Sequence, residues 1–406
     1  MLKIRKVVGA VAILAVFPLI LSACTGAPSA SPGSGSAAPA ATTPTVKVAL
    51  LCSSAGANDN GYNQTAINGL KQLATQKNID YKVVDSTTDY AATLKTVAQA
   101  GYNLVFSLEY DFTALINGVG GDKPLAEQFP DTTFVVFNDN PNLNKDGTPI
   151  FKNVISVMFN VNESSFLAGA LSVMVTENAS TLFDPSQYAF TPVPDGRKIG
   201  FIGGTQSDGI TVFSDGYAQG VNYAASQLGP DVTYTMYSTF NAGFTDTALG
   251  ATTAGTYYGQ GANVVFPSAG SVGDGVAAKA KEVKKLAIMV DANLDASQPG
   301  YILTSVIKNT NVPVVDLTQK ALDGTLAPEG GKEIDYTLAS NATGITDLSE
   351  LGKFVKNDDA ASAEWTKIKQ SLADIAAKIG DGTIKVSNAQ VGQHLDYSTL
   401  TNVKQG

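Results

Sequence analysis

Short apolar runs alternate with amphipathic stretches along most of the chain. Apolar runs predict strands at residues 46–52, 81–84, 104–108, 134–137, 154–158, 198–202, 233–237, 264–266 and 286–290. Apolar positions at the spacing of a helix predict helices at 65–76, 90–100, 165–176, 214–227, 246–258, 275–283 and 365–379. Strands that are apolar throughout, with helices between them, indicate parallel sheets covered on both faces. The predicted fold class is therefore α/β, and the number of strands favours two doubly wound, Rossmann-like lobes over one sheet.

The first 45 residues break this pattern. Residues 1–6 (MLKIRK) are basic, residues 7–20 are mostly apolar, and Leu-Ser-Ala-Cys24 follows. This order predicts a signal peptide at 1–23, and its ending resembles a bacterial lipobox, in which cleavage precedes a cysteine that carries lipid. A plain signal peptide or an N-terminal anchor helix is the alternative. Residues 25–45 are Ala, Ser, Pro, Gly and Thr, which predicts a flexible tether behind the lipidated Cys24. We expect a lipid-anchored protein on the extracytoplasmic face of the cell membrane.

Composition excludes several kinds of chemistry. The 406 residues carry a net charge of −9, and cleavage before Cys24 leaves 24 basic against 36 acidic residues, a net charge of −12. An acidic body argues against nucleic-acid binding. One His (His394) and two Cys are too few for a structural zinc site. Once Cys24 carries lipid, Cys52 has no intrachain partner, and its place in an apolar run predicts a small buried hydrophobe.

The usual catalytic motifs are missing from the sequence. There is no phosphate-binding G-x-x-x-x-G-K-[ST] pattern and no G-x-S-x-G nucleophile elbow. Residues 198–204 (KIGFIGG) place glycines after a strand, but without the spacing of a dinucleotide-binding turn. We therefore expect neither an enzyme nor a bound cofactor or metal.

Polar loops that contain aromatic side chains follow several predicted strands. Ligands of open α/β sheets bind beyond the carboxyl ends of the strands, where these loops lie. Core packing is a weak explanation for four aromatic residues in such loops, namely Tyr62, Tyr110, Phe240 and Phe244. Aromatic faces combined with carboxylates, amides and glycines predict a pocket for a small polar ring compound, such as a nucleoside or a sugar.

Seven stretches resemble, in order, one family of lipoproteins. This is the basic membrane protein (BMP) family, the substrate-binding components of ABC importers typified by purine nucleoside receptors. The stretches are 59–64 (DNGYNQ) with 69–71 (GLK), 164–171 (SSFLAGAL), 198–204 (KIGFIGG), 213–221 (FSDGYAQGV), 269–273 (AGSVG), Val290-Asp291 and 303–308 (LTSVIK).

The resemblance implies a type I periplasmic-binding-protein-like fold. Two Rossmann-like lobes with parallel sheets would be joined by a hinge, with the chain crossing between the lobes three times. The expected divisions are lobe 1 at 46–160 plus 291–322, lobe 2 at 161–290 plus 323–353, and a C-terminal helix and tail at 354–406.

The resemblance also implies how a nucleoside would be held. Tyr62 and Phe244 would stack on the base, while Asp291 and Lys308 would hold ribose hydroxyls beside the Gly270 backbone. A purely structural Asp291–Lys308 ion pair is the alternative. The family usually places Asp, which reads the base edge, where this chain has Asn138, so base selectivity stays open. The candidate ligand-binding residues are Ser53, Asp59, Tyr62, Asn63, Tyr110, Asn138, Asp139, Phe240, Phe244, Gly270, Asp291 and Lys308.

The expected function is capture of nucleosides, purine nucleosides foremost, for delivery to ABC permease subunits. The expected partners are the nucleoside, the permease and the membrane, reached through the lipid anchor. A receptor for a sugar or another small metabolite on the same fold is one alternative. A surface nucleoside-processing enzyme is another, although the sequence offers no catalytic constellation for it.

Overall fold

The computed structural model describes residues 46–85, 88–109 and 111–406. These residues belong to one compact unit, Pro44–Gly406. The predicted signal peptide, the lipidation site Cys24, the tether and the candidate residue Tyr110 lie outside the described residues. No helix among the described residues is long and apolar enough to span a membrane.

The first sheet has six strands in the order β11-β5-β4-β3-β1-β2, and all its pairings are parallel. Its strands are β1 (Lys47–Leu51), β2 (Asp80–Val84), β3 (Leu104–Ser107), β4 (Thr133–Phe137), β5 (Val154–Phe159) and β11 (Glu333–Tyr336). Side chains of β1 alternate between two cores: Val48 and Leu50 pack in one, Ala49 and Leu51 in the other. A strand buried on both faces has no polar face, which explains the continuous apolar runs of the sequence.

The second sheet has seven strands in the order β12-β10-β9-β8-β6-β7-β13. Only the pairing of β12 with β10 is antiparallel among the described strands of this sheet. Its strands are β6 (Lys198–Gly203), β7 (Tyr234–Thr239), β8 (Val264–Ser268), β9 (Leu286–Asp291), β10 (Ile302–Lys308), β12 (Thr343–Ile345) and β13 (Val403–Gln405). The α/β fold class with two mostly parallel sheets is thus confirmed.

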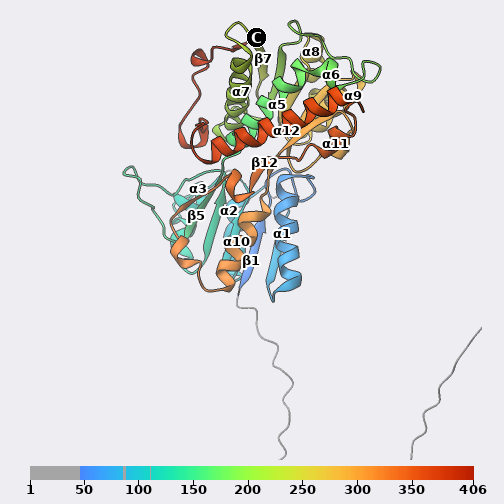
Figure 1. The fold of residues 1–406 in the computed structure, drawn as a ribbon. Helices are drawn as coiled ribbons and strands as arrows, with labels where there is room; N and C mark the ends of the chain where they lie inside the picture. The colour runs from blue at the N-terminus through green and yellow to red at the C-terminus, as the bar shows by residue number, and fades with distance from the viewer. Residues whose placement is uncertain (1–45, 86–87, 110) are drawn as a thin grey trace, which may run out of the picture. The chain divides into compact units, whose positions relative to one another are not determined.

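Helices cover both faces of each sheet (Figure 1). α1 packs with α10 beside the first sheet, whose other face packs against α2, α3 and α4. α5 and α7 pack together beside the second sheet, and α8 with α9 covers its other face. The helices are α1 (Tyr62–Gln76), α2 (Tyr90–Gln99), α3 (Thr113–Ile116), α4 (Leu125–Gln128), α5 (Val161–Glu177), α6 (Ala179–Leu182), α7 (Asp208–Leu228), α8 (Thr247–Gly259), α9 (Val272–Glu282), α10 (Asn311–Leu322), α11 (Ser349–Gly352) and α12 (Asp359–Gly380).

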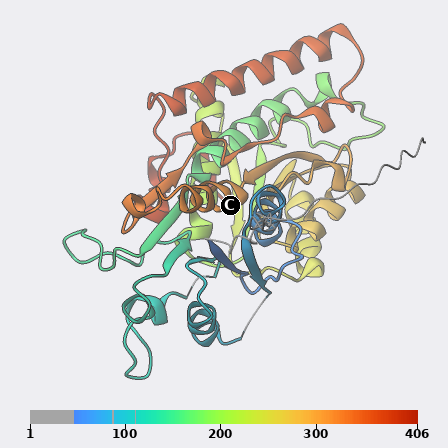
Figure 2. The ribbon, with the colours of Figure 1, turned by 90° about the horizontal axis from the view of Figure 1, so that it is seen from below.

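The contact between α5 and α7 is unusually close. A Cβ atom at Gly169 of α5 would collide with the backbone oxygen of Tyr217 in α7. The absence of a side chain at this position therefore lets the two helix backbones approach. α12, the amphipathic helix near the end of the sequence, packs on α5 and α6, as Figures 1 and 2 show.

The chain passes between the two sheets three times: after β5, after β10 and after β11. The lobe boundaries expected from the sequence differ from the strand pairing at two places. β10 pairs with β9 in the second sheet, although residues 291–322 were assigned to the first lobe. β11 pairs with β5 in the first sheet, although residues 323–353 were assigned to the second lobe. Both errors have one cause, because a short apolar run does not reveal which of two similar sheets it joins.

The C-terminal segment, defined here as residues 384–405, is more ordered than a polar tail. It runs along α7 and ends in β13, which pairs in parallel with β7. Asn402 fixes this end: its side chain donates to the backbone oxygens of Gly229 and Val232, and its backbone N–H donates to Asn222. The segment therefore belongs to the second sheet.

Candidate ligand-binding site

A cavity of about 610 Å³ lies at the carboxyl ends of strands from both sheets. Its wall is made by loops that follow β1 and β4 of the first sheet and β6, β7, β8 and β9 of the second. Lys308, at the end of β10, and Gln390, in the C-terminal segment, complete the wall. This volume lies in the range of small-molecule sites.

Nine of the twelve candidate residues line this cavity. They are Ser53, Asp59, Tyr62, Asn138, Asp139, Phe244, Gly270, Asp291 and Lys308. Asn63 and Phe240 do not line it, and Tyr110 lies outside the described residues. Phe240 instead packs its ring on Phe201, with the centroids 5.7 Å apart, so core packing explains this aromatic residue after all.

Asn63 is fully buried and holds the loop after β1 in shape. Its amide nitrogen donates to Ser53 Oγ and to the Gly56 backbone oxygen, both at 2.9 Å. Its amide oxygen accepts from the Ser53 backbone N–H. Asn63 thus acts beneath the cavity wall and positions Ser53 at the surface of the cavity.

Asp59 caps the first turn of α1. Its carboxylate accepts hydrogen bonds from the backbone N–H groups of Gly61, Asn63 and Gln64. A carboxylate is favoured there because the first N–H groups of a helix lack partners within the helix. The cap fixes the residue at which α1 begins, Tyr62, with its side chain in the cavity wall.

Tyr62 is held from both ends. The Asn138 amide nitrogen donates to its hydroxyl at 2.6 Å, and the Thr310 hydroxyl donates to its backbone oxygen at 2.7 Å. Only 7% of Tyr62 is exposed. The ring is therefore fixed before any ligand arrives, which lowers the entropy cost of stacking on it.

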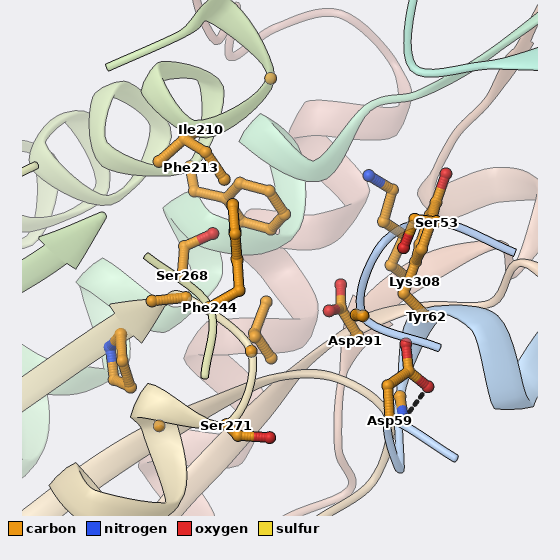
Figure 3. A pocket seen from close by; sticks show the side chains of 18 of the residues that line it. Ser53, Asp59, Tyr62, Ile210, Phe213, Phe244, Ser268, Ser271, Asp291 and Lys308 are labelled. Atoms are coloured by element: carbon orange, nitrogen blue, oxygen red, sulfur yellow. Dashed lines mark hydrogen bonds between the residues drawn. The ribbon is translucent and has the colours of Figure 1, made fainter. Parts of the chain in front are cut away.

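Phe244 and Phe213 bring aromatic rings from the second sheet's side. Figure 3 shows both rings on one side of the cavity, with Tyr62 and Lys308 on the other and Asp291 between them. The Phe244 ring lies directly against Gly204, where a Cβ atom would collide with it. Gly204 follows β6 in a stretch that lacks the spacing of a dinucleotide-binding turn. Its missing side chain instead makes room for the Phe244 ring.

Lys308 is surrounded by three aromatic rings. Its Nζ lies 5.4 Å from the ring centroid of Tyr62, 5.3 Å from that of Phe159 and 5.7 Å from that of Phe213. The side chain is 5% exposed. Cation–π attraction offsets part of the cost of burying its charge. Among the described residues, no hydrogen bond or ion pair to Lys308 Nζ is formed, so its three N–H donors are available to a ligand.

Asp291 ends the strand beside Lys308. Its Cα pairs with that of Ile307 in the β9–β10 register, so the two charged side chains leave neighbouring strands. Burial raises the pKa of Asp291 to about 6, a shift that Lys308 opposes and Asp59 adds to. Burial lowers the pKa of Lys308 to about 8, a shift that Asp291 opposes. Both pKa shifts favour the neutral form of the group, because each charge is removed from water and has no hydrogen-bonded partner of opposite charge among the described residues.

Sequence reasoning missed several residues of the cavity wall. α7 begins at Asp208, six residues before the predicted helix, and its first turns bring Asp208, Ile210 and Phe213 to the cavity. Phe213 stands in the stretch FSDGYAQGV, but no apolar periodicity distinguishes its role. Gln390 was missed because the segment after α12 carries no strong pattern of any kind.

The described residues offer neither a cluster for a metal ion nor a reactive thiol. Among the described residues, no cluster of three His, Cys, Asp or Glu side chains could hold a metal ion. Cys52 is fully buried and forms no disulfide, and burial raises the pKa of its thiol to about 12. A thiol so buried stays protonated, so it is the small buried hydrophobe that the sequence predicts and not a nucleophile.

Two doubly wound, mostly parallel sheets whose strand ends share one cavity define the fold of type I periplasmic binding proteins. The structure of a solute-binding protein of an ABC transporter from Aeropyrum pernix K1 has the same fold: it aligns with a TM-score of 0.65 at 20% identity, covering 87% of this chain and 95% of that one. The family model described as ABC transporter substrate-binding protein PnrA-like matches residues 45–378. The chain belongs to this family, the BMP family.

Curated relatives support the same conclusion. The chain is 29% identical to the "ABC transporter nucleoside-binding protein BmpA" of Lactococcus lactis subsp. cremoris, covering 84% of this chain and 89% of the relative. It is 26% identical to "Basic membrane protein A" of Borreliella afzelii, covering 78% and 85%. These relatives and structural neighbours are substrate-binding and membrane proteins by name, not enzymes.

Proposed function

We propose that this chain captures a nucleoside in the cavity between its two sheets and delivers it to an ABC permease. The observation that carries the proposal is a cavity that combines two aromatic rings with two charged side chains. Tyr62 and Phe244 lie on opposite sides of it. Asp291 lies between the two rings, and Lys308 lies beside Tyr62. A ring pair suits a flat base, because stacking accepts any base by its π-face. A carboxylate beside an ammonium suits the adjacent hydroxyls of a ribose.

Capture would work by closure. Tyr62 and Asn138 come from the first sheet, whereas Phe244, Asp291 and Lys308 come from the second. A ligand that touches both sets binds the closed arrangement better than an open one, and so shifts the population towards closure. The proposal includes purine nucleosides as the preferred ligands, because purine nucleoside receptors typify the BMP family. The name of the Lactococcus relative, a nucleoside-binding protein, supports nucleosides in general.

Anchoring is part of the same proposal. A lipid on Cys24 and an uncharged spacer at residues 25–45 would keep the receptor at the extracytoplasmic face, close to its permease. A net charge of −12 for the processed chain would keep the body from adhering to anionic lipid.

A thermal-shift panel tests the proposal against its main alternative. A ligand that binds only the folded state raises the unfolding temperature. We expect stabilisation by purine nucleosides and none by ribose or hexoses, and we expect a nucleoside in the mass spectrum of small molecules released when the purified protein is denatured. Stabilisation by sugars alone would favour a sugar receptor, and release of free base during incubation would indicate an enzyme.

A further inference from the structure

The C-terminal segment is a part of the site that the family match does not cover. The match ends at residue 378, whereas the segment comprises residues 384–405. It is fixed to α7 by hydrogen bonds that pair Ser387 with the Gln219 side chain and the Leu395 N–H with the Asp215 carboxylate. Because α7 and β13 both belong to the second sheet's side, the segment is carried by that side of the cavity.

One side chain of this segment reaches across to the first sheet's side. Gln390 Nε2 donates to the backbone oxygen of Asn138 at 3.1 Å. A backbone oxygen only accepts, so the amide nitrogen must occupy this place and the amide oxygen must be the free end. Gln390 Oε1 is buried and has no hydrogen-bond partner among the described residues.

Asn138 presents a second acceptor of the same kind. Its amide nitrogen is used on the Tyr62 hydroxyl, and its amide oxygen is buried with no partner in the described part of the chain. Asn138 and Gln390 both line the cavity. A buried acceptor left without a donor is unfavourable, so a ligand that brings N–H donors to this wall is favoured over one that does not.

We infer that Gln390 is a specificity-determining residue, which together with Asn138 selects a base whose edge carries N–H donors. The inference rests on the proposed nucleoside-binding function. It adds that the C-terminal segment, which lies outside the family match, contacts the base and discriminates between bases. Two amide oxygens accept from an exocyclic amino group or from a ring N–H. The selection would take effect on closure, because the two residues come from opposite sides of the cavity.

Calorimetry with matched nucleosides tests this inference. Each pair differs in a donor on the base edge: adenosine with purine riboside, inosine with 1-methylinosine, and guanosine with inosine. We expect wild type to prefer the donor-bearing member of at least one pair. Gln390→Met keeps the length of the side chain and removes the acceptor, so it should reduce that preference about five- to tenfold. Gln393→Met, in the same segment but exposed, is the control and should keep the preference.

Each outcome decides one question. Wild type that binds no nucleoside would overturn the proposed function, and this inference with it. Nucleoside binding with an equal preference in wild type and Gln390→Met would overturn the inference alone. The measured quantity is the ratio of the affinities of one variant for the two nucleosides of a pair. A general loss of stability in Gln390→Met lowers both affinities alike, so it does not produce the expected change in this ratio.

Discussion

Asn138 and Asp291 leave corresponding strands of the two sheets with the same left-handed backbone, at φ of 65° and 71°. Asn138 follows β4, which lies three strands from β2 in the first sheet. Asp291 ends β9, which lies three strands from β7 in the second sheet. Asn and Asp tolerate this conformation better than other residues with a side chain. The two sheets thus present one amide and one carboxylate to the same cavity from equivalent places.

The carboxylate of Asp291 should dominate the affinity for ribose hydroxyls. We predict that Asp291→Asn, which suits the left-handed backbone, weakens nucleoside binding about ten- to hundredfold, because hydrogen bonds to a charged group are lost. Isothermal titration calorimetry measures this directly. Asp274→Asn is the control, since Asp274 also lines the cavity but stands in the first turn of α9. Unchanged affinity in Asp291→Asn would remove this residue from the site.

Affinity should also depend on pH in a defined window. In the proposed complex, ionised Asp291 accepts hydrogen bonds from ribose hydroxyls, so we expect nucleoside affinity to rise as pH increases through its pKa of about 6. Lys308 donates best when protonated, so affinity falls as pH increases through its pKa of about 8. A plateau between these values is the expected result of titrations from pH 5 to 9. A flat profile in wild type would argue against a direct role for either group.

The burial of Asp291 also leads to a prediction about the stability of the folded protein. The pKa of Asp291 is raised on folding from 3.8 to about 6, so the native state binds the proton more tightly, and stability is lost as pH rises through about 6. Asp291→Asn removes this loss. We predict that the variant is more stable than wild type by about 1–2 kcal/mol at pH 7, with the difference vanishing near pH 4. Urea unfolding at both pH values measures it, and a variant less stable than wild type at pH 7 would refute the account of the burial cost.

The Phe244 ring depends on the absence of a side chain at Gly204. We predict that Gly204→Ala pushes the ring out of place and weakens nucleoside binding about tenfold, a loss comparable to that of stacking on one side of the base. Gly259→Ala in α8 is a suitable control, because a Cβ atom there meets nothing. Calorimetry on the two variants compares them. Equal affinities would mean that Phe244 does not contact the base.

Anchoring by lipid makes a separate prediction. Cys24→Ser should move the protein from the membrane fraction to the soluble fraction, because the proposed lipid would be attached to the sulfur of that residue. Cys52→Ala, at the buried cysteine, should leave the protein on the membrane. Fractionation followed by immunoblotting measures both variants. Retention of Cys24→Ser on the membrane would contradict the lipoprotein assignment.

Much of the fold follows from apolar patterning, and the parts that do not have physical reasons. Strands buried on both faces, such as β1 and β4, are continuous apolar runs, and the sequence reveals them together with the polar loops at their ends. Strands β10 and β11 were assigned to the wrong lobes because pairing with a distant strand leaves no local signal. Three-residue strands such as β12 and β13 owe their conformation to their neighbours.

The candidate site also contains residues that the sequence reveals and residues that only the tertiary structure reveals. A motif pointed to Asp59 and Asn63, and their hydrogen bonds explain what the two residues do there: Asp59 caps the first turn of α1, and Asn63 holds the loop after β1 in shape. Phe240 was misplaced because an aromatic residue in a polar loop still packs inward when a ring such as Phe201 lies beneath it. Gln390 could not be found, since only the tertiary fold brings it to Asn138, more than 250 positions earlier in the chain.

The most direct test of the central claim is a calorimetric titration of ligand-stripped wild type with a purine nucleoside and, in parallel, with free ribose. The account predicts one nucleoside bound per chain, with Asp291→Asn binding it far more weakly, and no measurable binding of ribose alone, because the stacking of Tyr62 and Phe244 requires a base. Binding of ribose or a hexose without binding of any nucleoside would contradict it.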